Sequence, residues 1–189
     1  PITSTEEFPL VSGSGFNPAS AVKIETMIKG IPFSIYSLHI ANSGSTNGHA
    51  QEFVSQVIPS ETNERYLVAC DFNHELNHPA MDSLEAAGMR PVWHDVNTDL
   101  VSTTSVVASS GIGIIDHILY SEGSGAYATM AGVLTLAKPL SDHKPVYAEI
   151  IFPTIQSVNI PLPQWLLYCQ FLLLCALYKF QRTTVRSLQ

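Results

Sequence analysis

The chain has 189 residues, enough for one domain with a hydrophobic core, because single domains commonly span about 50–250 residues. Hydrophobic residues make up 46% and charged residues 13%, which excludes a disordered, highly charged protein. The net charge of −7, without a Lys/Arg cluster in the body of the chain, excludes a broad basic surface for nucleic acid. It leaves open a DNA substrate whose phosphate is bound through a divalent cation.

Residues 1–19 are polar and rich in Gly, Ser and Pro, which predicts a loop or a leftover segment before the domain. Apolar and polar residues then alternate over 21–27 and 31–39, and this predicts two antiparallel strands joined by a tight turn. Further along the chain, we expect helices at 50–58 and 79–87, and strands at 67–70, 89–94, 114–120, 128–136 and 146–152. Mixed strands and helices predict an α/β or α+β layered domain over residues 20–153.

The C-terminal residues 154–189 differ from this body. Residues 165–178 are apolar except for Gln170, and basic residues follow them. A helix over 163–180 is near the lower limit for crossing a hydrocarbon core, which needs about 17–20 residues. The flanking charges and Trp165 favour a membrane anchor with its basic end in the cytoplasm. A helix packed on the domain and an appended stretch unrelated to the fold are the alternatives.

Polar side chains stand at the ends of the predicted strands. Asp71 and Asn73 follow the apolar run 67–70, and because they are two residues apart they project to the same side. A carboxylate can bind a hard cation, and an amide can donate to an anionic oxygen. Asp and Asn are also ordinary turn residues, so a turn without function is the alternative for this pair.

Asp142 and His143 are adjacent just before the strand 146–152. This pair offers a metal-binding or basic carboxylate next to an imidazole that changes charge near physiological pH. His143 also needs a carboxylate to orient its ring, and Asp116, at the end of another strand-like run, can supply one. His39 ends a strand in the same manner. Each residue alone can be structural, but polar groups at four strand ends predict one active site.

The other histidines and the cysteines fit structural roles. Cys70 lies in an apolar run and is interpreted as a small buried hydrophobe, and the three cysteines show neither a disulfide framework nor a zinc spacing. The histidines interpreted as surface or core residues are His49, His74, His78, His94 and His117. Of these, His74 is the least secure, because it directly follows the candidate site.

The order of these motifs resembles the endonuclease/exonuclease/phosphatase superfamily, which includes pancreatic-type deoxyribonuclease, abasic-site endonucleases, sphingomyelinases and inositol polyphosphate 5-phosphatases. The resemblance covers about residues 20–152 and is closest to pancreatic-type deoxyribonuclease and to the nuclease subunit of cytolethal distending toxins. The matching segments are Tyr36-Ser37-Leu38-His39, Ala69-Cys70-Asp71-Phe72-Asn73, Ile115-Asp116-His117-Ile118 and Ser141-Asp142-His143-Lys144-Pro145-Val146.

The resemblance implies a sandwich of two mixed β-sheets with helices outside, and Mg²⁺-dependent hydrolysis of a phosphoester, with Mn²⁺ or Ca²⁺ as alternative cofactors. It implies that His143 is the general base or a stabiliser of the pentavalent state, and that Asp116 orients it. Asp71 and Asn73 would hold the attacking water and the phosphate, and His39 would contact the scissile phosphate. The implied catalytic residues are His143, Asp116, Asp71, Asn73 and His39, and the implied metal ligands are Asp142 and Asp71.

The chain departs from the family pattern in two places. Cys70 stands where the family usually has Gly. The family's N-terminal Asn and its Gln-Glu pair, whose Glu binds the metal, have no match, and we do not assign that role to Glu6 or Glu7. We therefore expect the C-terminal portion of the domain, as a fragment or a truncated product.

The function expected from these residues is that of a metal-dependent phosphodiesterase, foremost a DNase-like endonuclease with DNA as its partner. A phosphoinositide phosphatase or another phosphoester phosphatase of the same fold is an alternative, and the membrane-like tail suits it. A second alternative is an inactive truncated domain with a binding or membrane-anchored role. A membrane-associated or a secreted location is compatible with the sequence.

Overall fold

The computed structural model describes residues 1–11, 19–40, 46–96, 113–134 and 143–153. The chain divides into two units, 1–153 and 154–189, and all described residues belong to the first. Within these described residues, no helix is long and apolar enough to cross a membrane. The predicted tail helix at 163–180 lies outside them.

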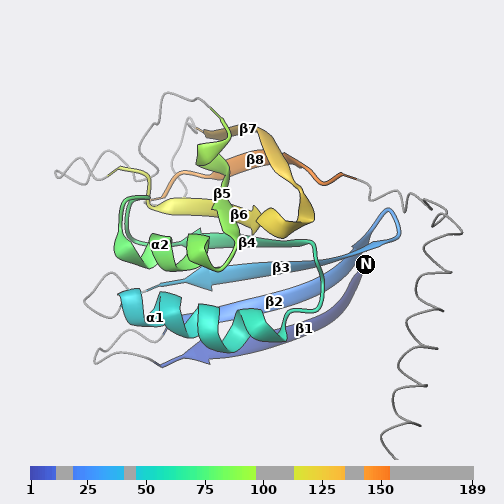
Figure 1. Cartoon of the computed structure of the whole chain (residues 1–189), viewed down its shortest axis with the longest axis horizontal. Coiled ribbons are helices and arrows are strands. Elements are labelled where there is room, and N and C mark those ends of the chain that lie inside the picture. Colours follow the sequence, from blue (N-terminus) through green and yellow to red (C-terminus); the bar gives the residue numbers. More distant parts are fainter. Residues whose placement is uncertain (12–18, 41–45, 97–112, 135–142, 154–189) are drawn as a thin grey trace, which may run out of the picture. The chain divides into compact units, whose positions relative to one another are not determined.

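A six-stranded sheet forms the centre of the first unit (Figure 1). Its strands lie in the order β1-β2-β3-β4-β6-β5, with β3 parallel to β4 and the other neighbours antiparallel. The strands are β1 Ile2–Leu10, β2 Ala19–Ile28, β3 Ile31–His39, β4 Tyr66–Asp71, β5 Met89–Pro91 and β6 Asp116–Ser121. The predicted hairpin is confirmed as β2–β3, and Lys29 and Gly30 have the positive φ angles, 52° and 80°, that its tight turn requires.

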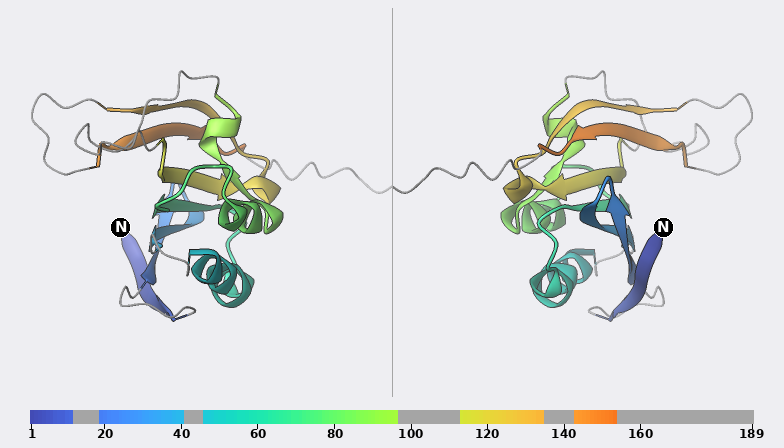
Figure 2. Two further views of the ribbon diagram at one scale, coloured as in Figure 1. Left: turned by 90° about the vertical axis from the view of Figure 1, so that its left-hand side faces the viewer. Right: turned by 90° about the vertical axis from the view of Figure 1, so that its right-hand side faces the viewer.

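Both α-helices cover the same face of this sheet (Figures 1 and 2). Helix α1, Thr46–Glu52, continues through a π-helical turn, Phe53–Val57, and a 3-10 turn, Ile58–Ser60, and forms the crossover between the parallel strands β3 and β4. Helix α2 spans Pro79–Ala86, and the Nδ1 atom of His78 caps it by accepting from Ala80 N at 3.2 Å.

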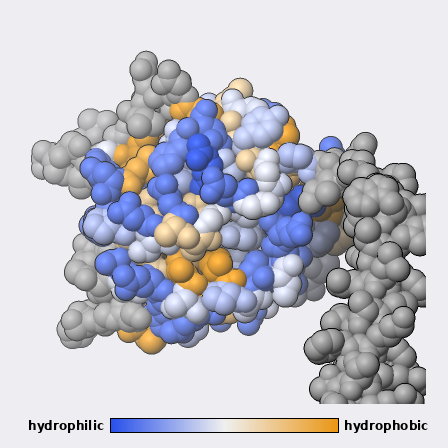
Figure 3. Space-filling model, viewed as in Figure 1, coloured by the Kyte–Doolittle hydropathy of each residue, from blue (hydrophilic) through white to orange (hydrophobic). Residues whose placement is uncertain are grey.

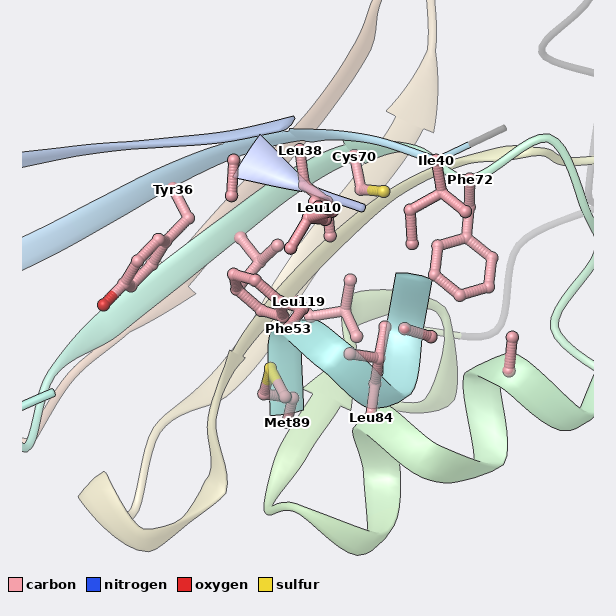
Figure 4. Close-up of a cluster of buried hydrophobic side chains, with 14 of the residues drawn as sticks. Leu10, Tyr36, Leu38, Ile40, Phe53, Cys70, Phe72, Leu84, Met89 and Leu119 are labelled. Atoms are coloured by element: carbon pink, nitrogen blue, oxygen red, sulfur yellow. The ribbon is translucent and has the colours of Figure 1, made fainter. Parts of the chain in front are cut away.

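The main core lies between the helices and this face of the sheet (Figure 4). Tyr36 and Leu38 of β3 and Cys70 of β4 face Phe53 and Leu84 of the helical layer, and all five are buried. The predicted burial of Cys70 is confirmed, and this burial raises the pKa of its thiol well above the usual value. Because strand residues alternate between faces, the residues between these core positions face the opposite side of the sheet.

A second, two-stranded sheet packs on that opposite side. Strands β7, Tyr127–Val133, and β8, Val146–Ile151, are antiparallel, and their inner apolar side chains pack with Tyr120 and Ile118 of β6. Asp95 anchors the packing, because it accepts hydrogen bonds from Tyr120 Oη and, at 2.7 Å, from Ala128 N. The predicted architecture of two sheets with helices outside is confirmed, as Figure 2 shows.

Several predicted boundaries differ from the observed ones. The loop predicted for residues 1–19 is wrong for residues 2–10, which form the edge strand β1. Most side chains of this strand are exposed, so its sequence does not alternate between apolar and polar residues. Its backbone hydrogen bonds to β2 hold it in the sheet. The strand predicted for 89–94 ends at Pro91, and a 3-10 turn, Val92–His94, follows it. The helix predicted for 50–58 begins earlier, at Thr46.

The surface over the helices is largely hydrophilic, with small hydrophobic areas between polar ones (Figure 3). This is the pattern of a solvent-facing helical layer, whose apolar stripe is turned inward. The face of the sheet opposite the helices carries the candidate site.

Candidate active site

Three polar side chains lie in one row across the neighbouring strands β3, β4 and β6. In the register of the sheet, His39 pairs with Asp71, and Asp71 pairs with Asp116. Because β6 runs antiparallel to β4, the first residue of β6 meets the last residue of β4. The three side chains alternate with the core residues of their strands and therefore share the face opposite the helices.

His143, just before β8, adds an imidazole to this row. Its Nδ1 atom lies 3.0 Å and 2.9 Å from the two carboxylate oxygens of Asp116. An ionised carboxylate only accepts, so this contact places the ring hydrogen on Nδ1 and leaves Nε2 as the nitrogen that can take up a proton. Nε2 lies 3.8 Å from Asp71 Oδ2.

Asp71 is at the centre of the cluster. Its Oδ2 atom lies 3.6 Å from His39 Nε2 and its Oδ1 atom accepts from the backbone N–H of Asn73 at 3.1 Å. Burial and the nearby charge of Asp116 raise the pKa of Asp71 above its usual value, and the imidazoles and the Asn73 N–H only partly offset this. The site thus contains two carboxylates that repel each other.

Asn73 links this cluster to the end of β3. Its backbone has a positive φ of 56°, which is uncommon for a residue with a side chain, although Asn tolerates it better than most. Its Nδ2 atom donates to the carbonyl of Ile40 at 2.8 Å, and Ile40 N donates to the Asp71 carbonyl at 3.0 Å. These contacts fix the backbone on either side of Asp71.

An open cavity of about 460 Å³ lies against the row. His39, Asp71 and Asp116 line it together with the positively charged Lys144. The remaining lining is mostly apolar or small, and includes Ser37, Ala69, Ile118, Pro145 and Val146. A charged ligand can therefore reach both carboxylates and the imidazole of His39 from solvent.

No family model and no curated protein matches the sequence, but solved structures match its fold. An endonuclease/exonuclease/phosphatase family protein from Bacteroides thetaiotaomicron is 19% identical, with a TM-score of 0.64, and the match covers 81% of this chain and 66% of that one. The mannosyl-6-phosphatase Bt3783 of the same species is 20% identical, with a TM-score of 0.61 and coverage of 80% and 67%. TDP2 from D. rerio, complexed with a single-strand DNA product, is 12% identical, with a TM-score of 0.60 and coverage of 79% and 68%.

This chain has the endonuclease/exonuclease/phosphatase fold. The match spans 66% of the length of the first of these structures, so the chain carries part of the fold that the larger protein contains. The predicted fold class and the resemblance of the sequence to this superfamily are confirmed at the level of the fold.

The endonuclease/exonuclease/phosphatase fold of this chain brings together side chains that suit a divalent cation. Asp71, Asp116 and His143 each offer one ligand atom, and these atoms lie within 4.8 Å of one another. Carboxylate oxygens are the ligands that hard cations prefer, and a cation would relieve the repulsion that raises the pKa of Asp71. Asp71 and Asp116 therefore fit such an ion, while His143 is oriented by Asp116.

Four of the predicted site residues lie together in the structure: His39, Asp71, Asp116 and His143. Asn73 adjoins them, with its side chain bound to backbone. Asp142, the other predicted metal ligand, lies outside the described residues. The sequence alone predicts for Asp116 only the orientation of His143. The sheet register, which sets Asp116 beside Asp71, makes it a candidate ligand as well.

Sequence reasoning assigned no site role to His117. This residue is 2% exposed, and its Nε2 atom lies 2.9 Å from the carbonyl oxygen of His74, in the segment that follows Asn73. Burial lowers the pKa of His117, so the ring is neutral. The only signal in the sequence is its position next to Asp116.

Proposed function

We propose that this chain is a metal-dependent phosphodiesterase and that it cleaves DNA as an endonuclease. The observation that carries the proposal is the His143–Asp116 pair beside Asp71, with both carboxylates lining an open cavity of the endonuclease/exonuclease/phosphatase fold. Attack of water on a phosphodiester needs a base for the water and positive charge for the developing oxyanion. The imidazole and a cation held by the two carboxylates would meet these needs.

In this proposal, His143 is the general base. Asp116 keeps the hydrogen on Nδ1, so Nε2 accepts the proton of the attacking water, and the carboxylate then stabilises the imidazolium. Nε2 lies 3.8 Å from Asp71 Oδ2, so the attacking water would lie next to a proposed metal ligand.

Asp71 and Asp116 would hold the divalent cation, with Asp142 proposed as a further ligand. We propose Mg²⁺ first and Mn²⁺ or Ca²⁺ as substitutes. When bound, such a cation binds the phosphate and stabilises its negative charge. His39, whose side chain is 59% exposed, would contact the scissile phosphate from the edge of the row. Asn73 would keep Asp71 in place for these contacts.

Two of the structural neighbours bear on the substrate. The TDP2 structure contains a single-strand DNA product, which supports a DNA phosphodiester as the substrate of this chain. The neighbour Bt3783 is a mannosyl-6-phosphatase, which supports phosphomonoester hydrolysis as a second candidate activity. A phosphoinositide phosphatase belongs to this second candidate.

The test is nicking of supercoiled plasmid by the purified chain with Mg²⁺, Mn²⁺ or Ca²⁺, compared with EDTA. We expect metal-dependent nicking that His143→Ala abolishes. His94→Ala is the matched control, because His94 lies outside the site and pairs with Glu85 at 3.6 Å. This variant should nick as the unchanged chain does.

Two outcomes would contradict the nuclease. If the plasmid stays intact while mannose 6-phosphate or a phosphoinositide releases phosphate in a His143-dependent manner, the second candidate is correct. If no substrate is cleaved with any of the three cations, the catalytic proposal is wrong and a binding role replaces it.

A further inference from the structure

Residues next to the neighbouring strands hold the segment from Asp71 to His74, here called the Asp71–His74 segment, from both sides. Next to β3, Ile40 N donates to the carbonyl of Asp71 at 3.0 Å, and the side chain of Asn73 donates through Nδ2 to the carbonyl of Ile40 at 2.8 Å. Towards β6, the N–H of Phe72 donates to the carbonyl of Ile115 at 2.9 Å. The segment carries Asp71, so its position decides where one of the two carboxylates lies.

His117 binds the far end of this segment through its side chain. Its Nε2 atom lies 2.9 Å from the carbonyl oxygen of His74, and because a carbonyl only accepts, Nε2 carries the hydrogen and donates it. The ring is buried and contacts Phe72 edge-on, with centroids 6.1 Å apart. Its Nδ1 atom is buried and has no hydrogen-bond partner among the described residues.

A buried imidazole with an unpartnered nitrogen is an unfavourable way to fill a core position, because desolvating an unpaired polar atom lowers stability. An apolar side chain could occupy the same space without this cost. What the imidazole adds is the hydrogen bond to His74, a residue 43 positions away in the sequence. His117 directly follows Asp116, and His74 ends the segment that carries Asp71. The hydrogen bond therefore connects the stretch of chain beside Asp116 with the stretch beside Asp71.

We propose that His117 is a positioning residue that holds the Asp71–His74 segment against β6 and so keeps Asp71 and Asp116 at the spacing that a shared cation needs. The part that concerns the cation rests on the proposed function, whereas the part that concerns the backbone does not. Removing an outer partner of a metal ligand typically weakens metal binding by about 10–100-fold.

The experiment compares His117→Leu, which removes the donor, with His117→Gln, whose amide nitrogen reaches about as far as Nε2. Amide hydrogen exchange reports on the segment, and titration with Mn²⁺ reports on the cation. We expect the amides of Phe72 and Asn73, which are hydrogen-bonded in the structure, to exchange about ten-fold faster in His117→Leu, and this variant to bind Mn²⁺ about ten-fold more weakly. His117→Gln should restore both towards the unchanged chain. His49→Leu is the matched control, because His49 is also buried with an unpartnered Nδ1 atom, and it should change neither readout.

Unchanged exchange in folded His117→Leu, or equal effects of Leu and Gln, would overturn the positioning role. If His117→Leu does not fold, His117→Asn replaces it, because its shorter amide cannot reach the His74 carbonyl; equal exchange in Asn and Gln variants would also overturn the role. If the exchange results are as expected but the unchanged chain binds no Mn²⁺, the proposed metal function fails and the backbone role remains.

Discussion

His143 contacts both carboxylate oxygens of Asp116 through one ring nitrogen, with Nδ1 at 3.0 Å from Oδ1 and 2.9 Å from Oδ2. The two residues are 27 positions apart, since Asp116 begins β6 of the six-stranded sheet and His143 precedes β8 of the two-stranded sheet. The pair therefore depends on the packing of β7–β8 against the six-stranded sheet. It also sets which nitrogen of His143 can accept a proton.

We expect Asp116→Asn to lower the rate of phosphodiester cleavage by about 10–100-fold, because the amide no longer stabilises the imidazolium and is a poorer cation ligand. The free energy of unfolding should change little, since the substitution preserves shape. Single-turnover nicking and urea unfolding measure the two effects. Full activity in this variant would mean that His143 needs no carboxylate to orient it.

We expect Asp71→Asn to stabilise the metal-free protein at pH 7 by about 0.5–2 kcal/mol. Burial and Asp116 raise the pKa of Asp71 in the folded state, so ionisation costs stability as pH rises from the unfolded value of about 4 through the raised folded value, and the cost persists at pH 7. The amide carries no charge and avoids this cost.

Urea unfolding at pH 7 and near pH 4 tests this prediction. The difference in free energy of unfolding between Asp71→Asn and the unchanged chain should shrink near pH 4. At that pH a larger fraction of Asp71 is protonated in both the folded and the unfolded state, so less of the cost of ionisation remains. With saturating Mn²⁺ the unchanged chain should be more stable than Asp71→Asn, because only the carboxylate binds the ion well. A less stable Asp71→Asn at pH 7 without metal would show that the contacts of Asp71 outweigh its repulsion from Asp116.

The sequence predicted that polar residues stand at the ends of strands, but it did not predict their contacts. Asp71 and Asp116 adjoin apolar runs of strand length, and this position alone indicates a strand end at a sheet edge. The edge strand β1 could not be predicted, because most of its side chains are exposed and only Phe8 and Leu10, near its end, pack with the core. The hydrogen bond of His117 could not be predicted either, since its partner is the backbone carbonyl of His74, which only the fold brings close.

A buried ionic group on the helix side of the sheet should control acid stability. Glu61, with its side chain 2% exposed, accepts from Tyr36 Oη at 2.6 Å and from Asn63 N at 2.6 Å, and Lys23 Nζ lies 3.3 Å away. Burial alone would raise the pKa of Glu61, but these donors lower it below its usual value. Its contribution to stability is therefore present above the unfolded pKa and is lost as pH falls through the folded one.

We expect Glu61→Gln to lose about 1–3 kcal/mol at pH 7, because Tyr36 and Asn63 lose an ionised acceptor and Lys23 keeps only the more exposed Glu25, 2.8 Å away, as its carboxylate partner. The loss should be smaller in acid. The exposed Glu64→Gln is the control and should be within about 0.5 kcal/mol of the unchanged chain. Urea unfolding between pH 3 and pH 7 measures both. Equal losses in the two variants would mean that the buried group contributes no more than a surface charge.

Substitutions at Asn73 can distinguish the contribution of its side-chain amide from the effect of its positive φ angle. At a φ of 56°, Ala is strained and Gly is not, so Asn73→Gly should be about 1 kcal/mol more stable than Asn73→Ala. Both lack the amide that donates to Ile40 at 2.8 Å, so both should lose cleavage activity to a similar extent, about ten-fold. Thermal unfolding and plasmid nicking by the two variants provide the comparison. If Asn73→Gly is fully active, the amide has no part in holding Asp71, and Asn73 is present for its tolerance of the left-handed backbone.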